Sequence, residues 1–439
     1  MHEVVLDGRD LDLATVGSVA RGEARLALGP HARARIEAAH AVVRRVLEGT
    51  EQVYGVNTGF GHLKDIRIPP QDLEALQANL IRSHAAGVGA PLPDDAVRAL
   101  MLLRTHVLAL GHSGVRPIVV ESLIAHLNAG VLPVIPEQGS VGASGDLAPL
   151  SHLALLLMGE GRARVGGRTL PAAEAQKAAK IAPLTLGPKE GIALINGTQM
   201  ITALGALAAI EARNLAAHAD LAGAASLEAL KGSHKAFEAR LHDLKPHPGQ
   251  IESATNLRAL LDDSAIARSH AGCGRVQDAY SLRCMPQVHG AAREVIRFVE
   301  TLLTTEINAV TDNPIVFPES GELVSGGNFH GEAPAMALDA LAIAAAEIAS
   351  IAERRIERLM NPVFSGLPAF LTRSPGVNSG LMMAQVTAAA LVSENKILCH
   401  PACVDSIPSS AGREDHVSMG AHSAWKLTRV VDNTRRVLA

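Results

Sequence analysis

The sequence predicts a mainly α-helical protein in which a bundle of long helices follows a mixed N-terminal region. Hydrophobic residues make up 48% of the 439 residues and charged residues 19%, a balance typical of globular proteins. Only 2% are aromatic, so alanine, leucine, valine and isoleucine supply most of the apolar share, and such chains favour closely packed helices. Residues 334–359 form the longest stretch of uninterrupted helical periodicity. It corresponds to a rod of roughly 39 Å, which needs neighbouring helices along its length.

The remaining elements follow from apolar periodicity and from the positions of glycine and proline. Ile36, Val43 and Leu47 share one helical face, and the helix they predict precedes a glycine-punctuated loop over 54–61. We expect a strand-like start at residues 4–6, a short helix after it, and helices over 31–47, 71–86, 94–111 and 116–129. Proline and glycine exclude regular structure from residues 131–145, and an apolar helix follows over 147–158. Residues 161–190 should form a surface excursion with a small hairpin, and the chain should be helical again from 191 onward. We place the domains at 1–205 and 206–439.

Charge and cysteine content exclude several classes of partner. The net charge of −4 and the pI near 6.6 indicate neither nucleic acid nor an anionic membrane surface. Cys399 and Cys403 lie one helical turn apart, but the four cysteines form no CxxC pair, so we favour free thiols over a zinc site and expect no metal. The first residues carry no basic leader or apolar stretch, and charges interrupt the apolar runs before membrane-spanning length. We therefore expect a cytoplasmic protein without a membrane partner.

The triplet Ala143-Ser144-Gly145, followed by Asp146, carries the most informative chemistry. In a tight bend, the unhindered amide nitrogen of Gly145 can attack the carbonyl carbon of Ala143. Loss of two waters, one of which involves the Ser144 hydroxyl, then gives 4-methylideneimidazol-5-one (MIO), a strong electrophile. A plain turn before a helix is one alternative. A serine-hydrolase elbow is another, but GxSxG requires a glycine two places after the serine, where Asp146 stands.

The longer string Gly139-Ser-Val-Gly-Ala-Ser-Gly-Asp-Leu-Ala-Pro-Leu-Ser-His152 resembles the signature of the aromatic amino acid ammonia-lyase family. The resemblance covers nearly the whole chain and implies an elongated helical bundle of the ammonia-lyase/fumarase-aspartase type, an MIO group made from residues 143–145, and no dissociable cofactor. It also implies a homotetramer with sites assembled from several subunits, and further helix after Ala439, where this chain stops. Further motifs match in the family's order: Tyr54-Gly-Val-Asn-Thr-Gly-Phe-Gly61, Asn196-Gly-Thr198, Gln277-Asp-Ala-Tyr-Ser-Leu-Arg283, Thr311-Asp-Asn-Pro314 and Gly326-Gly-Asn-Phe-His-Gly331.

Two positions resemble the members that act on histidine. His84 and Glu414 stand where phenylalanine and tyrosine lyases typically carry an apolar residue and glutamine, although Gly412-Arg413 replaces the usual Asn-Gln before the glutamate. An imidazole offers one donor and one acceptor, and a pocket for it needs polar partners on both sides. The implied reaction converts L-histidine to trans-urocanate and ammonia, the first step of histidine degradation. The alternatives are a tyrosine or phenylalanine lyase, a 2,3-aminomutase, and an inactive helical scaffold.

The resemblance also implies roles for individual residues. Tyr54 is the base that takes the β-proton, with Glu414 as a rival for that role as well as a partner for the imidazole. The chain has only two tyrosines, and both fall inside family motifs. The other implied roles are catalysis for Tyr280, formation of MIO for Asp146, carboxylate binding for Arg283, orientation of the carboxylate or the electrophile for Asn196 and Gln277, contact with the substrate ring for Phe329, and substrate binding for His84.

Overall fold

The computed structural model describes residues 2–50, 52–53, 55–59 and 66–439, and it divides into two compact units. The first unit contains Met1–Leu207, Leu302–Met336 and Ala402–Trp425, and the second contains Ala208–Thr301, Ala337–Pro401 and Lys426–Ala439. Each unit therefore collects three separate segments of the chain. The division into domains 1–205 and 206–439 stays a prediction.

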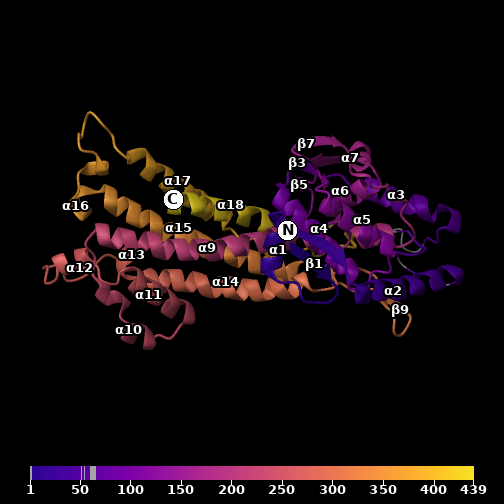
Figure 1. The fold of residues 1–439 in the computed structure, drawn as a ribbon, viewed down its shortest axis with the longest axis horizontal. Coiled ribbons are helices and arrows are strands. Elements are labelled where there is room, and N and C mark those ends of the chain that lie inside the picture. The colour runs from indigo at the N-terminus through magenta and orange to yellow at the C-terminus, as the bar shows by residue number, and fades with distance from the viewer. Residues whose placement is uncertain (1, 51, 54, 60–65) are drawn as a thin grey trace. The chain divides into compact units, whose positions relative to one another are not determined.

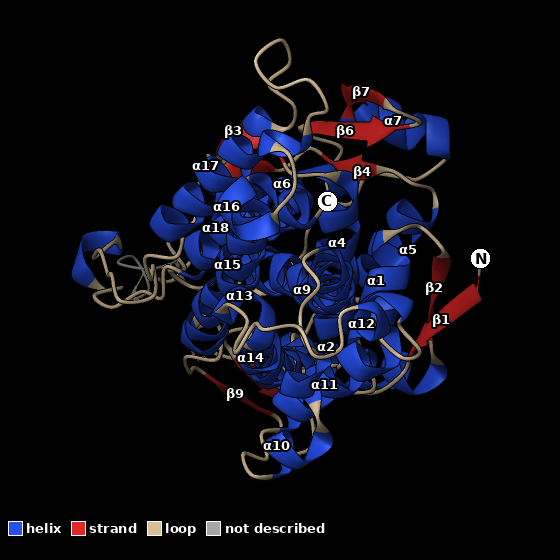
Figure 2. Ribbon diagram, turned by 90° about the vertical axis from the view of Figure 1, so that its left-hand side faces the viewer, coloured by secondary structure: helices blue, strands red, loops and turns tan. Residues whose placement is uncertain are grey.

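Helices form most of the described chain, and the strands are short (Figure 2). This confirms the prediction of a mainly α-helical fold with a mixed N-terminal region. The helices of eight or more residues are α1 Leu13–Ala20, α2 Pro30–Glu48, α3 Leu73–His84, α4 Asp94–Ala109, α5 Pro117–Asn128, α6 Leu147–Leu157, α7 Ala172–Ala179, α9 Gln199–Ala229, α11 Pro248–Leu260, α14 Met285–Ile307, α15 Glu332–Met360, α17 Met382–Leu398 and α18 Gly420–Leu438. The short helices are η2 Pro70–Asp72, α8 Glu190–Ile195, η3 His234–Phe237, α10 Ala239–Asp243, α12 Ala265–Ser269, α13 Tyr280–Arg283, α16 Pro362–Ser365, η4 Ala369–Leu371 and η5 Ser410–Gly412.

Helix α4 lies at the centre of the first unit. Every residue from Ala99 to Ala109 is buried, which is typical of a helix enclosed on all sides. It packs against α1, α2 and α5. Proline at the first position starts α2 and α5, where its missing N–H would have had no partner within the helix. The charged side chain of Arg104 is buried together with this helix.

The strands are confined to the first unit in the described residues, and they form small sheets. Strand β1 (His2–Leu6) pairs with β2 (Ala24–Leu28) in parallel. The remaining strands pair in antiparallel fashion: β3 (Val88–Pro91) with β5 (Pro136–Gln138), β6 (Arg162–Val165) with both β4 (Leu132–Pro133) and β7 (Arg168–Pro171), and β8 (Ile315–Phe317) with β9 (Glu322–Val324).

Several sequence predictions need correction. Segment 131–145 is not wholly irregular, because β4 and β5 lie in it; proline is tolerated in such short strands at a sheet edge. The hairpin expected within 161–190 is present as β6 and β7, but helix α7 follows it and was not expected. The longest helix of the described chain is not the one around 334–359, since α9 has 31 residues and α15 has 29.

Charged residues interrupt the longest apolar runs, as predicted: Glu211, Arg213 and Asp220 lie within α9, and Asp339, Glu347 and Glu353 lie within α15. Helices α9 and α15 are long and apolar enough to cross a membrane by length and composition alone. In both, 67% of the apolar window is buried inside the structure. That burial is what the core helix of a soluble protein would show, so these helices are weak evidence for a membrane span.

The second unit is a bundle of long helices joined by a shared apolar core. In Figure 1, α9, α14 and α15 run alongside one another, and α17 and α18 lie on the other side of α15. Residues of α9, α11, α13, α14 and α15 meet in one cluster, which includes Leu227, Leu257, Leu282, Met285 and Ile351. Small residues on α15 allow α17 and α18 to approach it closely in a second cluster. This arrangement supplies the neighbours that a rod as apolar as α15 requires.

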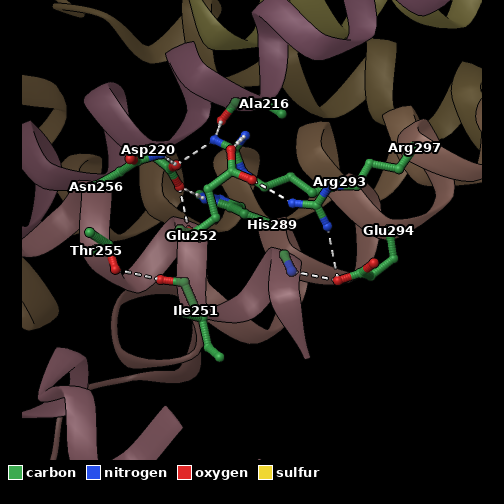
Figure 3. A network of polar contacts seen from close by, with 12 residues as sticks. Ala216, Asp220, Ile251, Glu252, Thr255, Asn256, His289, Arg293, Glu294 and Arg297 are labelled. Atoms are coloured by element: carbon green, nitrogen blue, oxygen red, sulfur yellow. Dashed lines mark hydrogen bonds and ion pairs between the residues drawn. The ribbon is translucent and has the colours of Figure 1, made fainter. Parts of the chain in front are cut away.

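A buried polar network crosses the same bundle (Figure 3). Asp220 on α9 accepts hydrogen bonds from His289 Nδ1 at 2.8 Å and Ser253 Oγ at 2.6 Å, and it pairs with Arg293 at 2.6 Å. Asn256 donates to the same carboxylate at 3.0 Å. Burial raises the pKa of Asp220, but the hydrogen bonds from these side chains and the attraction of His289 lower it overall. Burial lowers the pKa of His289 despite its bond to Asp220.

Replacing Asp220 with alanine should destabilise the protein strongly. The substitution removes the more buried of the two carboxylates that pair with Arg293, the other being Glu252, and it takes the acceptor from His289 and Ser253. Breaking a buried network of this kind costs about 3–5 kcal/mol. Thermal and urea unfolding would measure the loss. Asp262→Ala, at an exposed position of the same unit, is the control and should change stability by less than about 0.5 kcal/mol. Equal stability of the two variants would contradict the structural role of the network.

Candidate active site

The Ala-Ser-Gly triplet forms a tight turn directly before α6. The amide of Gly145 donates to the carbonyl oxygen of Gly142 at 3.2 Å, which closes a four-residue turn. Ser144 has a backbone φ of 53°, which lies in the left-handed region that residues other than glycine rarely adopt. Ser140 Oγ supports the turn from outside, donating to the Gly145 carbonyl at 3.2 Å and accepting from Gly142 N at 3.1 Å. The backbone of the triplet is therefore held in a sharply bent conformation.

Gly197 holds the other side of this turn at a distance that only glycine allows. The carbonyl oxygen of Gly197 accepts from Asp146 N at 2.7 Å, and its amide donates to the Ser144 carbonyl at 3.2 Å. A Cβ atom added to Gly145 would collide with the Gly197 carbonyl group. The nitrogen of Gly145 thus has no side chain beside it, and these features fit the bent precursor that cyclisation to MIO needs.

Asp146 links the turn to the start of α9. Its carboxylate is fully buried and accepts from the amides of Met200 at 2.8 Å and Ile201 at 3.0 Å, in the first turn of that helix. Its other oxygen, Oδ1, is buried without a hydrogen bond to any described residue. Burial raises the pKa of Asp146 to about 7, although the two amides and Arg104 oppose the rise. Burial therefore favours the protonated carboxyl group.

This raised pKa predicts a pH-dependent effect of Asp146→Asn. Because the pKa rises from its ordinary value of 3.8 to about 7 in the folded protein, the folded state holds the proton more tightly. The resulting stabilisation is complete below about pH 4 and is lost as the pH rises through about 7. Asparagine mimics the protonated acid, so its stability relative to aspartate should increase over this range, by at most about 4 kcal/mol. Melting curves at several pH values would measure this change in stability, with Ser144→Ala present in both the Asp146 protein and the Asp146→Asn variant. A stability difference between the two that does not change with pH would contradict the raised pKa of Asp146.

Asn196 lies beside the turn and is fixed by a buried arginine. Arg104 donates to the Asn196 carbonyl from both terminal nitrogens, at 2.8 and 2.9 Å, and to the Ala193 carbonyl at 2.9 Å. Burial lowers the pKa of Arg104 to about 10, and the charges of Asp312 and Asp146 counteract part of that effect. The Asn196 side chain donates to the Asn313 carbonyl at 3.1 Å, while its Oδ1 is buried without a described partner. Asn196 is thus positioned through its main chain, and its side-chain oxygen has no hydrogen bond from the described residues.

Glu414 approaches the triplet from a segment 270 residues further along the chain. Its Oε1 accepts from Ser144 Oγ at 3.2 Å, and its Oε2 accepts from Ser410 Oγ at 2.8 Å and closely from Ser409 Oγ. Ser409 and Glu414 also bond through their backbones. Ser410, Ala411 and Gly412 between them all have left-handed φ values. This loop holds a carboxylate directly against the hydroxyl that cyclisation would remove.

Two further predicted residues belong to the first unit. His84 is the last residue of α3 and is partly buried, and its Nδ1 bonds the Leu80 carbonyl of the same helix at 2.8 Å. This bond leaves Nε2 as the ring nitrogen available to a ligand. Phe329 belongs to the loop before α15 and is partly buried. Among the described residues, no hydrogen bond joins His84 to Glu414.

Gln277, Tyr280 and Arg283 belong to the second unit. Tyr280 begins α13 and is 70% exposed, and the guanidinium carbon of Arg283 lies 4.7 Å from the centre of its ring. Such a cation–π contact holds an arginine in place while leaving it charged. Gln277 is exposed in the segment before α13 and lines a cavity of about 260 Å³ with Arg275 and Arg358.

The sequence did not predict some residues that contact the site, and the structure does not test one residue that it did predict. Gly197, Arg104, Ser409 and Ser410 touch the site but were not predicted. Gly197 had a signal, because it lies inside the quoted motif Asn196-Gly-Thr198. The two serines had none, since a pair of serines before a glutamate is common. Tyr54, the predicted base, lies outside the described residues.

Comparison with known proteins agrees with this geometry. The family model for aromatic amino acid lyases matches residues 11–439. The chain is 58% identical to histidine ammonia-lyase of Anaeromyxobacter dehalogenans (strain 2CP-C), over 100% of this chain and 88% of that protein. It is 56% identical to the histidine ammonia-lyase of Gloeobacter violaceus (strain ATCC 29082 / PCC 7421), over 99% and 85%. The chain therefore belongs to the aromatic amino acid lyase family, which confirms the resemblance seen in its motifs.

Solved structures of this family show the same fold. Histidine ammonia-lyase from Trypanosoma cruzi superposes with a TM-score of 0.91 at 49% identity, covering 99% of this chain and 82% of that one. Tyrosine aminomutase from Streptomyces globisporus gives a TM-score of 0.94 at 39% identity, covering 99% and 86%. The fold is thus shared by members named for different activities, and the choice among them depends on the site.

Proposed function

We propose that this protein is a histidine ammonia-lyase, which converts L-histidine to trans-urocanate and ammonia as the first step of histidine degradation. The observation that carries the proposal is the bent Ala143-Ser144-Gly145 turn with the Glu414 carboxylate on its serine. Relatives at 56–58% identity that carry this name support it, whereas the tyrosine aminomutase is 39% identical. A tyrosine or phenylalanine lyase and a 2,3-aminomutase are therefore less favoured.

We infer that residues 143–145 form MIO without outside help and that no dissociable cofactor is needed. When formed, this group supplies an electrophile that captures the substrate amine and makes it a better leaving group. The chain contributes the bent backbone, the unhindered nitrogen of Gly145 and the neighbouring helix ends. Helix α6 begins two residues after the triplet, and the first turn of α9 faces Asp146. The positive ends of both helix dipoles favour negative charge in this region.

The remaining roles concern the substrate's two polar ends and its β-proton. Arg283 binds the carboxylate, because a planar guanidinium can form two parallel bonds to it, and Tyr280 supports that arginine through their ring contact. Gln277 and Asn196 orient the carboxylate or the electrophile, and Phe329 packs on the imidazole. Tyr54 and Glu414 are the two candidates for the base. A tyrosine in this role needs its anion stabilised, because an unperturbed phenol has a pKa near 10.

His84→Leu should reduce kcat/KM for L-histidine by roughly 10- to 100-fold while leaving the melting temperature nearly unchanged. The variant cannot bond one nitrogen of the substrate imidazole, and an unpaired buried polar group costs about 1–3 kcal/mol. The bond that His84 Nδ1 makes to the Leu80 carbonyl lies within one helix and is partly exposed, so its removal should cost little folding stability. Arg82→Leu, an exposed change on the same helix, is the control. A loss of stability that parallels the loss of activity would make His84 structural.

The decisive experiment for the substrate is a product analysis with purified protein. We expect urocanate and ammonia from L-histidine, with little turnover of L-tyrosine or L-phenylalanine. Strong turnover of tyrosine with none of histidine would overturn the substrate assignment, and a β-amino acid product would identify an aminomutase. We also propose a cytoplasmic homotetramer with sites shared between subunits. Analytical ultracentrifugation would test the tetramer.

A further inference from the structure

A cluster of metal-ligating side chains lies next to the candidate site in the first unit. His330 and Glu332 flank Gly331 where α15 begins, and His416 comes from the segment before α18. Their ligand atoms all lie within 4.8 Å of one another. This set contains no cysteine, so it is separate from the sulfur sites considered in the sequence. The two segments that meet here are more than 80 residues apart, which is why spacing did not reveal the cluster.

The three side chains of the cluster lie near one another, but no hydrogen bond of ordinary length joins Glu332 to His416. The rings of His330 and His416 stack at 5.8 Å between centroids with an angle of 5° between their planes. Glu332 Oε2 lies 3.9 Å from His416 Nε2, which is beyond hydrogen-bond length. That oxygen is also shielded from solvent and accepts no hydrogen bond from a described residue. A shielded carboxylate oxygen without a donor, beside two imidazoles, has chemistry that a cation would satisfy.

One hydrogen bond fixes the ring of His330 in the way that is common for metal-binding histidines. Its Nε2 lies 3.2 Å from the His416 carbonyl oxygen. A neutral ring that donates from Nε2 to a carbonyl presents the lone pair of Nδ1, and ligating histidines usually donate their other N–H in this way. The His416 side chain is 68% exposed. Zinc bonds to histidine are about 2.0–2.1 Å, so the ligand atoms need to close by roughly 1 Å.

We propose that His330, Glu332 and His416 bind one divalent transition-metal ion of the zinc type, with water as a further ligand. Two imidazoles and one carboxylate suit Zn²⁺ and Co²⁺ better than Mg²⁺ or Ca²⁺, which prefer all-oxygen ligands. His330 follows Phe329 directly, and His416 lies two residues after Glu414. The ion would therefore join the two segments that carry these site residues. This binding site is independent of whether the triplet reacts.

The test is Zn²⁺ binding by the full-length, metal-stripped protein, measured by competition with a chromophoric chelator, and by Co²⁺ absorption spectra. We expect one tight site per chain. His416→Ala, at an exposed side chain, and the isosteric Glu332→Gln should each weaken it by roughly 10- to 100-fold. Melting curves show whether each variant is folded, and the two substitutions perturb different segments.

The chain has 19 histidines, so a matched control is needed for adventitious binding. His234→Ala removes a histidine that lies 3.1 Å from the Glu228 carboxylate in the second unit, and it should leave the tight site unchanged. Ser144→Ala should also bind Zn²⁺ as the wild type does, which separates this proposal from the proposed reaction. Equal affinity in wild type, His416→Ala and Glu332→Gln would overturn the site, as would only weak binding at several equivalents in all proteins.

Discussion

Ser144→Ala should lower histidine ammonia-lyase activity by about 10⁴-fold or more while the protein remains folded. The variant has no hydroxyl to lose and cannot supply the methylene of the electrophile, and removing a principal catalytic group typically has an effect of this size. The cost to folding is small, because Ser144 Oγ makes one 3.2 Å bond, to Glu414. Urocanate release measured by absorbance gives the activity, and a melting curve gives the stability.

Ser151→Ala is the matched control for this variant. Its hydroxyl bonds the Leu147 carbonyl within α6 at 2.7 Å, so its removal should leave activity nearly unchanged. Activity of Ser144→Ala above about one hundredth of the wild-type value would contradict the role of the triplet, because general acid–base groups alone could then sustain the reaction.

Glu414→Gln should lower kcat/KM by roughly 10²- to 10⁴-fold, the range of a lost general base or charged partner. Glutamine keeps the size of the side chain and can still accept from Ser409 and Ser410, so the loop should keep its shape. It loses the negative charge, which a carboxylate base needs to take a proton and which favours the binding of an imidazolium. Steady-state kinetics with L-histidine across pH would measure this.

Asp415→Asn provides the comparison, because its exposed neighbouring carboxylate lies in the same loop. That variant should retain nearly full activity. If Glu414→Gln loses less than about tenfold, Glu414 has neither role, and the base assignment would rest on Tyr54 alone.

Local patterns in the sequence predicted the bounds of α2, α3, α4, α5, α6 and α15 within a few residues, and they indicated further helix after residue 191 without its bounds. Apolar periodicity located α2, α4, α5 and α6, because each buries one or more faces regardless of what lies against it. The parallel pairing of β1 with β2 was not foreseen, since α1 separates the two strands and their pairing depends on tertiary contacts. The polar network around Asp220 likewise joins three helices that no sequence spacing relates.

The candidate site also contains residues that the sequence predicted and contacts that it did not. The triplet, Asp146 and Asn196 were evident because each lies in a compact motif. The contact between Ser144 and Glu414 spans 270 residues, and the donors Ser409 and Ser410 reach the carboxylate only through a run of left-handed residues. Backbone conformations of this kind depend on the surrounding structure, so a single sequence does not reveal them. Gly197 could have been predicted from its motif, as a place where two backbones approach too closely for a side chain.

The most direct test of the account is the mass of residues 143–145 in freshly purified, active protein. Intact-mass measurement followed by peptide fragmentation should find the chain lighter by two waters, with the whole deficit in Ala143-Ser144-Gly145 and none in the Ser144→Ala variant. An active protein whose triplet has the full mass of an open peptide would contradict the central claim, because an ordinary turn would then be catalysing the reaction.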